Sequence, residues 1–570
     1  MSDRFNCYPI DKLLNWILKE LETGYIFGIH KDLFFIPEQS DVFRMKRYGQ
    51  LLETPIGVAA GPHTQLSQNI IAAWLTGARY MELKTVQVLD ELDVTKPCIA
   101  MEDEGYNCEW SQELKLDQSY SEYLNAWIVI HFLKHRFGWG EPDQLGTIFN
   151  MSVGYNMEGI LDPKVQRFMD NMMNCRIEKN QRIDLLAKTY PEIRDINIPD
   201  CISDNITLST MHGCPSDEIE KIGRYLIEER KINTAIKLNP TLLGTEKLRD
   251  ILNEQQAFDV IVPDEAFSHD LKYEAGVELI KNLRKSAEKT GVEFGLKLTN
   301  TLETENSFQS LPKKEGMVYM SGRALHAISI NVAAKLQNEF DGVLDISFCA
   351  GVDCYNIAPA LASHMKPVTV CSDILKPGGY GRLSQYLIEI NKAFKGKSAD
   401  SIENYVLAVA NQKSDIQSAG LKNLIEYAEA VIGTEPYHKN SFPYDTVKTK
   451  KLLPTFDCAT APCVISCPTE QDVPGYMLAT AGGDYEKAYQ LIKKTNPFPN
   501  LQGMVCDHPC QYKCTRLNYD QPLLIREIKR FIAEKSRSLS IEKAKTQTGD
   551  KAAIIGAGPA GLSCAYYLAL

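Results

Sequence analysis

Short apolar stretches recur between residues 50 and 390, and most are separated by a segment that can form a helix. Eight of them are candidate strands: 56–60, 80–85, 146–152, 205–210, 234–239, 294–300, 343–349 and 367–371. Near-continuous apolar runs are typical of parallel strands that are covered on both faces. Eight such strands predict a (β/α)₈ barrel of the TIM type. An open, doubly wound sheet remains the alternative, because periodicity does not separate the two folds.

Polar residues and glycines cluster where these strands end, and barrel enzymes carry their chemistry at the C-terminal ends of their strands. Lys84 and Lys237 follow apolar residues, and a buried ammonium needs a counter-charge, so they indicate an anionic ligand. A lysine whose charged end extends to solvent is the alternative. Gly322, Gly351 and the backbone at Cys371 and Ser372 are suited to bind a phosphate through their N–H groups.

Cysteines are distributed unevenly along the chain. Six of the sixteen lie within one short region: Cys458, Cys463, Cys467, Cys506, Cys510 and Cys514. Two closely spaced triplets, the first followed by Pro468, are typical of [4Fe–4S] ligation. Zinc is the competing metal, but structural zinc sites usually show paired cysteines two residues apart. We therefore expect iron–sulfur clusters.

A glycine-rich turn lies near the end of the sequence. Gly556, Gly558 and Gly561 follow the apolar pair Ile554 and Ile555 and precede a predicted helix. This spacing allows a backbone turn to approach a pyrophosphate at the start of a helix. Because the sequence stops at Leu570, we expect only the first βα segment of a Rossmann-like FAD domain. We also expect the chain to be a fragment that does not hold FAD by itself.

Composition narrows the possible partners. The chain has 62 Lys and Arg against 73 Asp and Glu, a formal charge of −11, which argues against a nucleic-acid or anionic-membrane surface. Its longest apolar runs are too short to span a bilayer, and we find no secretory signal, so we expect a cytoplasmic protein. We predict a barrel over residues 1–400, a helical extension and linker over 401–450, a helical iron–sulfur domain over 451–546 and a truncated FAD domain over 547–570.

Several of these motifs resemble known flavoproteins. PIGVAAG at residues 55–61 and ELKTV at 82–86 resemble the flavin-binding start of dihydroorotate dehydrogenases and, more closely, the FMN barrel of dihydropyrimidine dehydrogenase. The cysteine triplets resemble the iron–sulfur domain of dihydropyrimidine dehydrogenase and of the glutamate synthase small subunit. The order of barrel, iron–sulfur and FAD segments resembles the YgfK-type family of selenate reductase iron–sulfur/flavin subunits.

The resemblance implies particular site residues. Cofactor-binding residues are then Ala60, Gly61, Lys84, Thr85, Lys237, Thr299, Gly322, Gly351, Cys371 and Ser372 for FMN, and Gly556, Gly558 and Gly561 for FAD. Asn156 and Asn300, with Thr301 beside the latter, would hold a cyclic amide or ureide, because a carboxamide offers both a donor and an acceptor. Loop capping is the alternative use of both asparagines.

The loop after the fourth strand departs from the family pattern. Where relatives have a Cys or Ser as the proton donor, this chain has Thr210, whose hydroxyl is a poor acid. We expect Cys214 to replace it, since it precedes a helix whose N-terminus favours a thiolate. A small loop residue is the alternative reading of Cys214, and His212 is a second candidate acid.

The number of clusters stays open at this point. The relatives carry two clusters and have a further cysteine at the position of Thr455, together with a Gln or Glu ligand near Lys529, with Glu527 close by. Six thiols without this further cysteine allow one complete cluster, or two clusters completed by other ligands.

Together these features predict an oxidoreductase that passes electrons between an FAD/NAD(P)H module and an FMN site. Its substrate would be a small cyclic amide of pyrimidine or purine type. The nicotinamide nucleotide would bind through the missing C-terminal part, and other oxidoreductase subunits are expected partners. The alternative function is a non-catalytic electron-transfer or scaffold subunit of a larger, molybdenum-hydroxylase-like complex.

Overall fold

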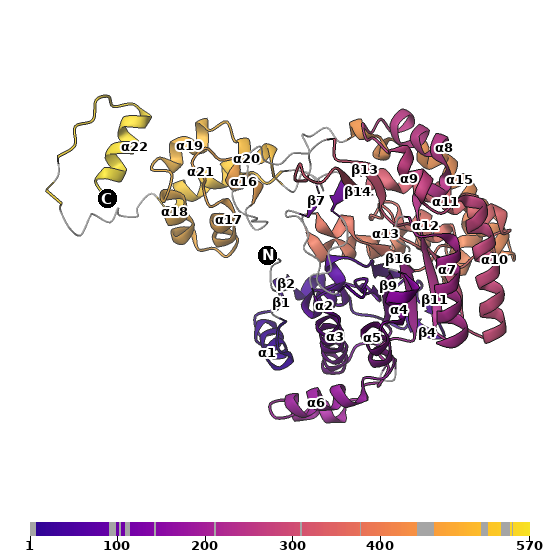
Figure 1. Ribbon diagram of the computed structural model, residues 1–570. Coiled ribbons are helices and arrows are strands. Elements are labelled where there is room, and N and C mark those ends of the chain that lie inside the picture. Colours follow the sequence, from indigo (N-terminus) through magenta and orange to yellow (C-terminus); the bar gives the residue numbers. More distant parts are fainter. Residues whose placement is uncertain are drawn as a thin grey trace. The chain divides into compact units, whose positions relative to one another are not determined.

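The computed structural model (Figure 1) describes residues 7–89, 98–101, 104–108, 114–141, 144–154, 156–209, 213–307, 311–376, 378–441, 461–514, 522–536, 548–549 and 551–570. The chain divides into two compact units, Met1–Tyr444 and Asp445–Leu570. Within the described ranges, no helix has the length and apolar character that crossing a membrane requires.

Eight parallel strands of the first unit close into a barrel. Around the barrel their order is β10 (Asn205–Ser209), β11 (Asn233–Leu238), β12 (Phe294–Leu298), β15 (Ile346–Phe348), β16 (Val368–Val370), β5 (Ile56–Val58), β6 (Tyr80–Glu82) and β9 (Ile148–Gly154). Each overlaps one predicted strand, and closure confirms the barrel over the open sheet. Several strands end before the predicted runs do, because the last residues leave the hydrogen-bonded ladder and enter the loops of the site.

Helices alternate with these strands and cover the barrel. The main ones are α2 (Ser67–Leu75), α3 (Leu116–Phe137), α7 (Ser216–Arg224), α10 (Tyr273–Thr290), α11 (Arg323–Glu339) and α13 (Leu383–Gly396). Other helices of this unit are α1 (Ile10–Leu21), α4 (Met157–Leu161), α5 (Pro163–Met173), α6 (Arg176–Leu186), α8 (Thr245–Arg249), α9 (Asp264–His269), α12 (Ile357–Ala362), α14 (Ile402–Ala410) and α15 (Ile416–Ile432).

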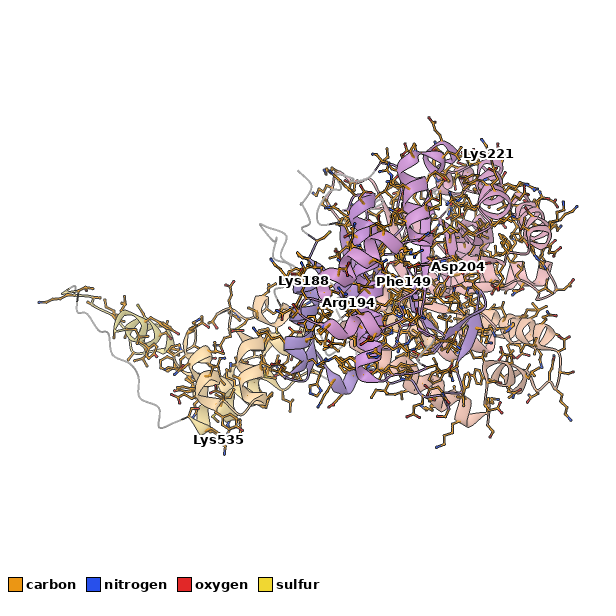
Figure 2. All side chains as sticks on the ribbon, turned by 90° about the horizontal axis from the view of Figure 1, so that it is seen from below. Phe149, Lys188, Arg194, Asp204, Lys221 and Lys535 are labelled. Atoms are coloured by element: carbon orange, nitrogen blue, oxygen red, sulfur yellow. The ribbon has the colours of Figure 1, made fainter. Side chains whose placement is uncertain are left out.

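Amphipathic spacing explains how these helices pack. In α10, Val277, Ile280, Leu283 and Ala287 are buried at intervals of three and four residues, and the helix ends at Gly291, whose φ of 75° favours glycine. Figure 2 shows Phe149 of β9 within the unit, where its ring lies 5.3 Å from that of Trp127 on α3. Lys221 of α7 lies toward the periphery in the same view and is exposed.

A small antiparallel sheet lies beside the barrel strand ends, and we call it the roof sheet. Its strands are ordered β13 (Leu302–Glu305), β14 (Met317–Gly322), β8 (Glu104–Asn107) and β7 (Ile99–Met101). Two hairpins, β1 (Tyr25–Ile26) with β2 (Ile29–His30) and β3 (Met45–Arg47) with β4 (Gln50–Leu52), complete the strands described. Neither the roof sheet nor the hairpins were predicted from the sequence.

The second unit is helical where it is described. Its helices are α16 (Pro462–Ile465), α17 (Val473–Ala481), α18 (Tyr485–Lys493), α19 (Pro499–Val505), α20 (Pro509–Tyr512), α21 (Ile525–Lys535) and α22 (Pro559–Leu568). A small core that includes Val473, Tyr476, Ile492 and Ile532 joins α17, α18 and α21.

The glycine-rich segment forms a helix but not the predicted strand. Residues 551–557 carry no strand, and Ile555 is fully exposed, because no described strand lies beside it to complete a ladder. The glycine turn itself is tight: a Cβ on Gly561 would lie 2.1 Å from the carbonyl oxygen of Gly556. The proposed domain boundaries stay predictions.

Candidate functional site

A cavity of about 310 Å³ lies where the barrel strands end and the roof sheet begins. The predicted site residues that line it are Ala60, Gly61, Lys84, Thr85, Lys237, Thr299, Asn300, Thr301, Gly322, Gly351, Cys371 and Ser372. Parallel strands bring their C-terminal ends to one edge, which explains why residues so distant in sequence meet here. The volume falls at the lower end of the range for ligand pockets.

A buried ion cluster lies at the inner end of this cavity. Glu82 at the end of β6 is fully buried, and its Oε2 lies 3.0 Å from Nζ of Lys297. Its Oε1 lies 3.8 Å from Nζ of Lys237. Burial alone raises the pKa of Glu82, but Lys297 and Lys237 outweigh burial, so the pKa is lowered and the carboxylate stays ionised.

This cluster corrects the expectation for Lys237. The sequence indicated that its charge required an anionic ligand, whereas the structure supplies an internal carboxylate, Glu82. Lys297 was missed, although a charged residue within the apolar run 294–300 was a signal. Two lysine side chains therefore share the carboxylate of Glu82.

Two glycines and two serines form a backbone cradle between β14 and the loops after β15 and β16. Gly322 precedes α11 with a φ of 85°, and Gly351 has a φ of 53°, both in the left-handed region. A Cβ on Gly351 would lie 2.5 Å from the carbonyl oxygen of Gly322, so only glycine allows this approach. Oγ of Ser321 and Oγ of Ser372 are 3.0 Å apart beside it. A helix start with neighbouring hydroxyl groups suits a phosphate.

The cavity wall opposite the barrel is one face of the roof sheet. In the strand register, Glu303 lies opposite Tyr319, Tyr319 lies opposite Asn107, and Asn107 lies opposite Ile99. All four residues line the cavity. Directly opposite residues of neighbouring strands share a face. This row therefore presents a carboxylate, a phenol and a carboxamide to whatever the cavity holds.

Sequence reasoning also missed a histidine beside this wall. His269, the last residue of α9, lines the cavity, and its Nε2 lies 3.0 Å from Oε2 of Glu303. The next residue, Asp270, is buried and accepts hydrogen bonds from the backbone N–H of Gly213 (3.2 Å) and from Oγ1 of Thr241 (2.8 Å). His269 is thereby held against the loop that follows β10.

Within the described part of the chain, the structure places none of the proton donors predicted on that loop at the cavity. Thr210 and His212 lie outside the described residues. Cys214 is half-buried and is not among the described residues that line the cavity. Burial, followed by the carboxylates of Glu218 and Asp217, raises the pKa of its thiol to about 11. The expected stabilisation of a thiolate by the helix start is therefore not found.

The two asparagines also differ in their surroundings. Oδ1 of Asn156 accepts the backbone N–H of Gly159 at 2.8 Å and so caps α4, which is the capping alternative. Asn300 lines the cavity, and its Nδ2 donates to Oδ1 of Asn239 at 2.7 Å. This bond orients the Asn300 carboxamide within the cavity wall.

The cysteines of the second unit converge. Cys463 interacts electrostatically with Cys514 and Cys467, and Cys510 interacts with Cys467 and Cys506. Thiols of both triplets therefore lie near one another, whereas Cys458 falls outside the described residues. Among the described side chains, no three Cys, His, Asp or Glu residues are arranged to hold a single metal ion.

The position predicted for a non-cysteine ligand is also defined. Lys529 is buried, and its charge lowers the pKa of Cys510, although burial dominates and raises that pKa to about 11. Glu527 pairs with Arg526 at 2.8 Å. A lysine thus lies beside the thiols at the position where the resemblance implied a ligand, so the number of clusters stays open.

Comparison with known families identifies both units. Residues 27–422 match the family model "Oxidoreductase YgfK, N-terminal TIM-barrel domain". Residues 453–541 match the model "Dihydropyrimidine dehydrogenase domain II, 4Fe-4S cluster". These matches confirm the resemblance inferred from the motifs and the preference for a [4Fe–4S] domain over zinc.

Individual relatives agree with the family models. The oxidoreductase YgfK of Escherichia coli (strain K12) is 40% identical over 595 residues, covering 100% of this chain and 55% of that protein. The chain therefore spans about half the length of this relative. The beta subunit of an NADP⁺-dependent formate dehydrogenase from Moorella thermoacetica is 38% identical over 19% of each chain. The small chain of Bacillus subtilis glutamate synthase [NADPH] is 34% identical over 19% of this chain and 24% of its own.

The thiol arrangement predicts iron and acid-labile sulfide in the anaerobically purified protein. We expect about four irons per chain for one cluster or about eight for two. Cys510→Ser should remove iron, whereas Cys564→Ser, which changes an exposed cysteine of the same unit, should not. Zinc without sulfide in the wild-type protein, or unchanged iron in Cys510→Ser, would contradict this assignment.

Proposed function

Because the chain belongs to the oxidoreductase YgfK family, we propose that it forms the FMN and iron–sulfur part of an electron-transferring flavoprotein. The cavity at the barrel strand ends carries this proposal. It combines strand-end lysines, a glycine–serine cradle and an oriented carboxamide within one space of about 310 Å³.

The residues around the cavity fit FMN group by group. Gly322, Gly351 and Ser372 would hold the phosphate, because a side chain on Gly351 would close the cradle. Lys84 and Lys237 would face the electron-accepting edge of the ring system, where reduction places negative charge. Bound FMN supplies hydride and single-electron chemistry.

We propose a planar cyclic amide or ureide, of pyrimidine or purine type, as the substrate. Asn300 and Thr301 offer hydrogen bonds from the barrel side, and Asn107, Tyr319 and Glu303 offer them from the roof sheet. The Glu303 carboxylate accepts N–H groups, which such rings carry on their edges. Asn156 stays a prediction, and its oxygen is used in the helix cap.

For proton transfer we favour His269, assisted by Glu303, over Cys214. A group that exchanges a proton with the substrate must be within hydrogen-bond reach of it. His269 and Glu303 line the cavity and form a pair at 3.0 Å, whereas Cys214 is not a lining residue and keeps its proton strongly. We therefore propose His269 on α9 as the proton donor, in place of a residue on the loop after β10.

Electrons would travel through the iron–sulfur unit. The relatives that share this unit include subunits whose names refer to NADP⁺ or NADPH, which supports a nicotinamide nucleotide as the distant donor or acceptor. Gly556, Gly558 and Gly561 would begin the FAD site. Other oxidoreductase subunits are proposed partners.

One observation favours a second function: Cys214 is not among the described residues that line the cavity. Loss of the acid at that loop is expected in a non-catalytic electron-transfer or scaffold subunit. An experiment distinguishes the two functions, because only an enzyme would reduce or oxidise a cyclic amide.

The FMN assignment predicts that the purified or reconstituted protein releases FMN on denaturation. Lys84→Ala should weaken FMN binding about tenfold or more, since a charge-assisted hydrogen bond contributes about 1.5–3 kcal/mol. Lys221→Ala removes an exposed lysine of α7 and should leave binding unchanged (Figure 2). A protein that takes up no FMN, or equal binding by both variants and the wild type, would refute it.

The proton-transfer assignment is tested on the full-length, reconstituted protein. Cyclic amides are first screened anaerobically by flavin bleaching. His269→Gln should lower turnover of the active compound about 10²–10⁴-fold while the flavin is still reduced by its electron donor. Cys214→Ala should change turnover little. The reverse pattern would restore Cys214 as the acid, and no bleaching by any compound would favour the non-catalytic function.

A further inference from the structure

The barrel interior contains two lysines side by side. Lys237 of β11 and Lys297 of β12 are paired in the register of neighbouring strands. Like charges placed directly opposite repel each other, and burial strengthens the repulsion. Glu82 approaches both from β6, at 3.0 Å from Lys297 and 3.8 Å from Lys237. This carboxylate therefore offsets the positive charge of both lysines.

The two lysines nevertheless have different surroundings. The side chain of Lys297 is 2% exposed, and its Nζ donates to Oγ of Ser347 at 3.2 Å and to Oγ1 of Thr369. The side chain of Lys237 is 12% exposed and lines the cavity. Lys297 is thus held by interior groups, whereas Lys237 lines the cavity.

We propose that Glu82 and Lys297 are positioning residues that set the positive charge presented by Lys237, and thereby the reduction potential of bound FMN. This inference rests on the proposed function, since it assumes FMN in the cavity. Neither residue is among those described as lining the cavity, so both act through Lys237 and through the electric field.

The physical reason lies in the charge change on reduction. A flavin that takes up two electrons and one proton gains one negative charge. A nearby positive charge in a medium of low polarity favours the reduced form, and a negative charge disfavours it. Glu82 and Lys297 have opposite charges and the same interior location, so removing each should move the potential in opposite directions.

The test measures the midpoint potential of FMN in the full reconstituted protein, together with FMN affinity and thermal unfolding. Lys297→Met should lower the potential by about 30 mV or more, which equals a tenfold change in equilibrium for a two-electron couple. Glu82→Gln should raise it. The double variant keeps the net charge of the wild type and should return close to the wild-type potential.

Ser347→Ala is the matched control, because it removes a hydrogen bond from Lys297 without changing charge. It should shift the potential much less than Lys297→Met. If one single variant fails to fold, the double variant and the other single variant still decide the sign of the effect; Lys297→Gln replaces Lys297→Met if both singles fail.

Two outcomes would overturn the inference alone. Lys297→Met could bind FMN with an unchanged potential, or the two single variants could shift it in the same direction; either result means a purely structural role. A wild-type protein without FMN would instead refute the proposed function, and this inference with it.

Discussion

Two lysine ammonium groups are buried beside each other in this barrel, and the polar groups around them are arranged to offset their charge. Removing an ion from water costs several kcal/mol, and breaking a buried pair by losing one partner costs about 3–5 kcal/mol. Lys237 and Lys297 are adjacent in register, and the carboxylate of Glu82 lies 3.8 Å from the first and 3.0 Å from the second. The hydroxyl groups of Ser347 and Thr369 complete the surroundings of Lys297. Through Lys237, this buried polar cluster places a charged group in the wall of the cavity.

The remaining walls of the site come from elements with different geometry. Parallel strand ends supply lysines, glycines and the Asn300 carboxamide, whereas the antiparallel roof sheet supplies a row of polar side chains that face them. The cradle proposed for the phosphate depends on the left-handed conformation of Gly322 and Gly351. Both layers therefore contribute polar groups to one cavity.

Sequence patterns predicted the barrel because strands covered on both faces leave near-continuous apolar runs. They also predicted the part of the cavity that the strand ends form, since parallel strands bring their C-terminal ends to one edge. The roof sheet could not be predicted from the sequence, because β8 and β14 are short and pair across distant parts of the chain. The partner of Lys297 and the position of His269 depend on the same long-range geometry. Asn156 was ambiguous from the sequence, since capping and ligand binding use the same carboxamide.

The most direct test of the account compares FMN with riboflavin in titrations of the flavin-free, full-length protein, followed by flavin fluorescence. The two ligands differ only by the phosphate, so the comparison isolates the cradle at Gly322, Gly351 and Ser372 from the ring site. The account predicts one FMN per chain in the barrel and at least about tenfold weaker binding of riboflavin, because charge-assisted bonds to the phosphate are lost. Equal affinity for the two, or no binding of either, would contradict it.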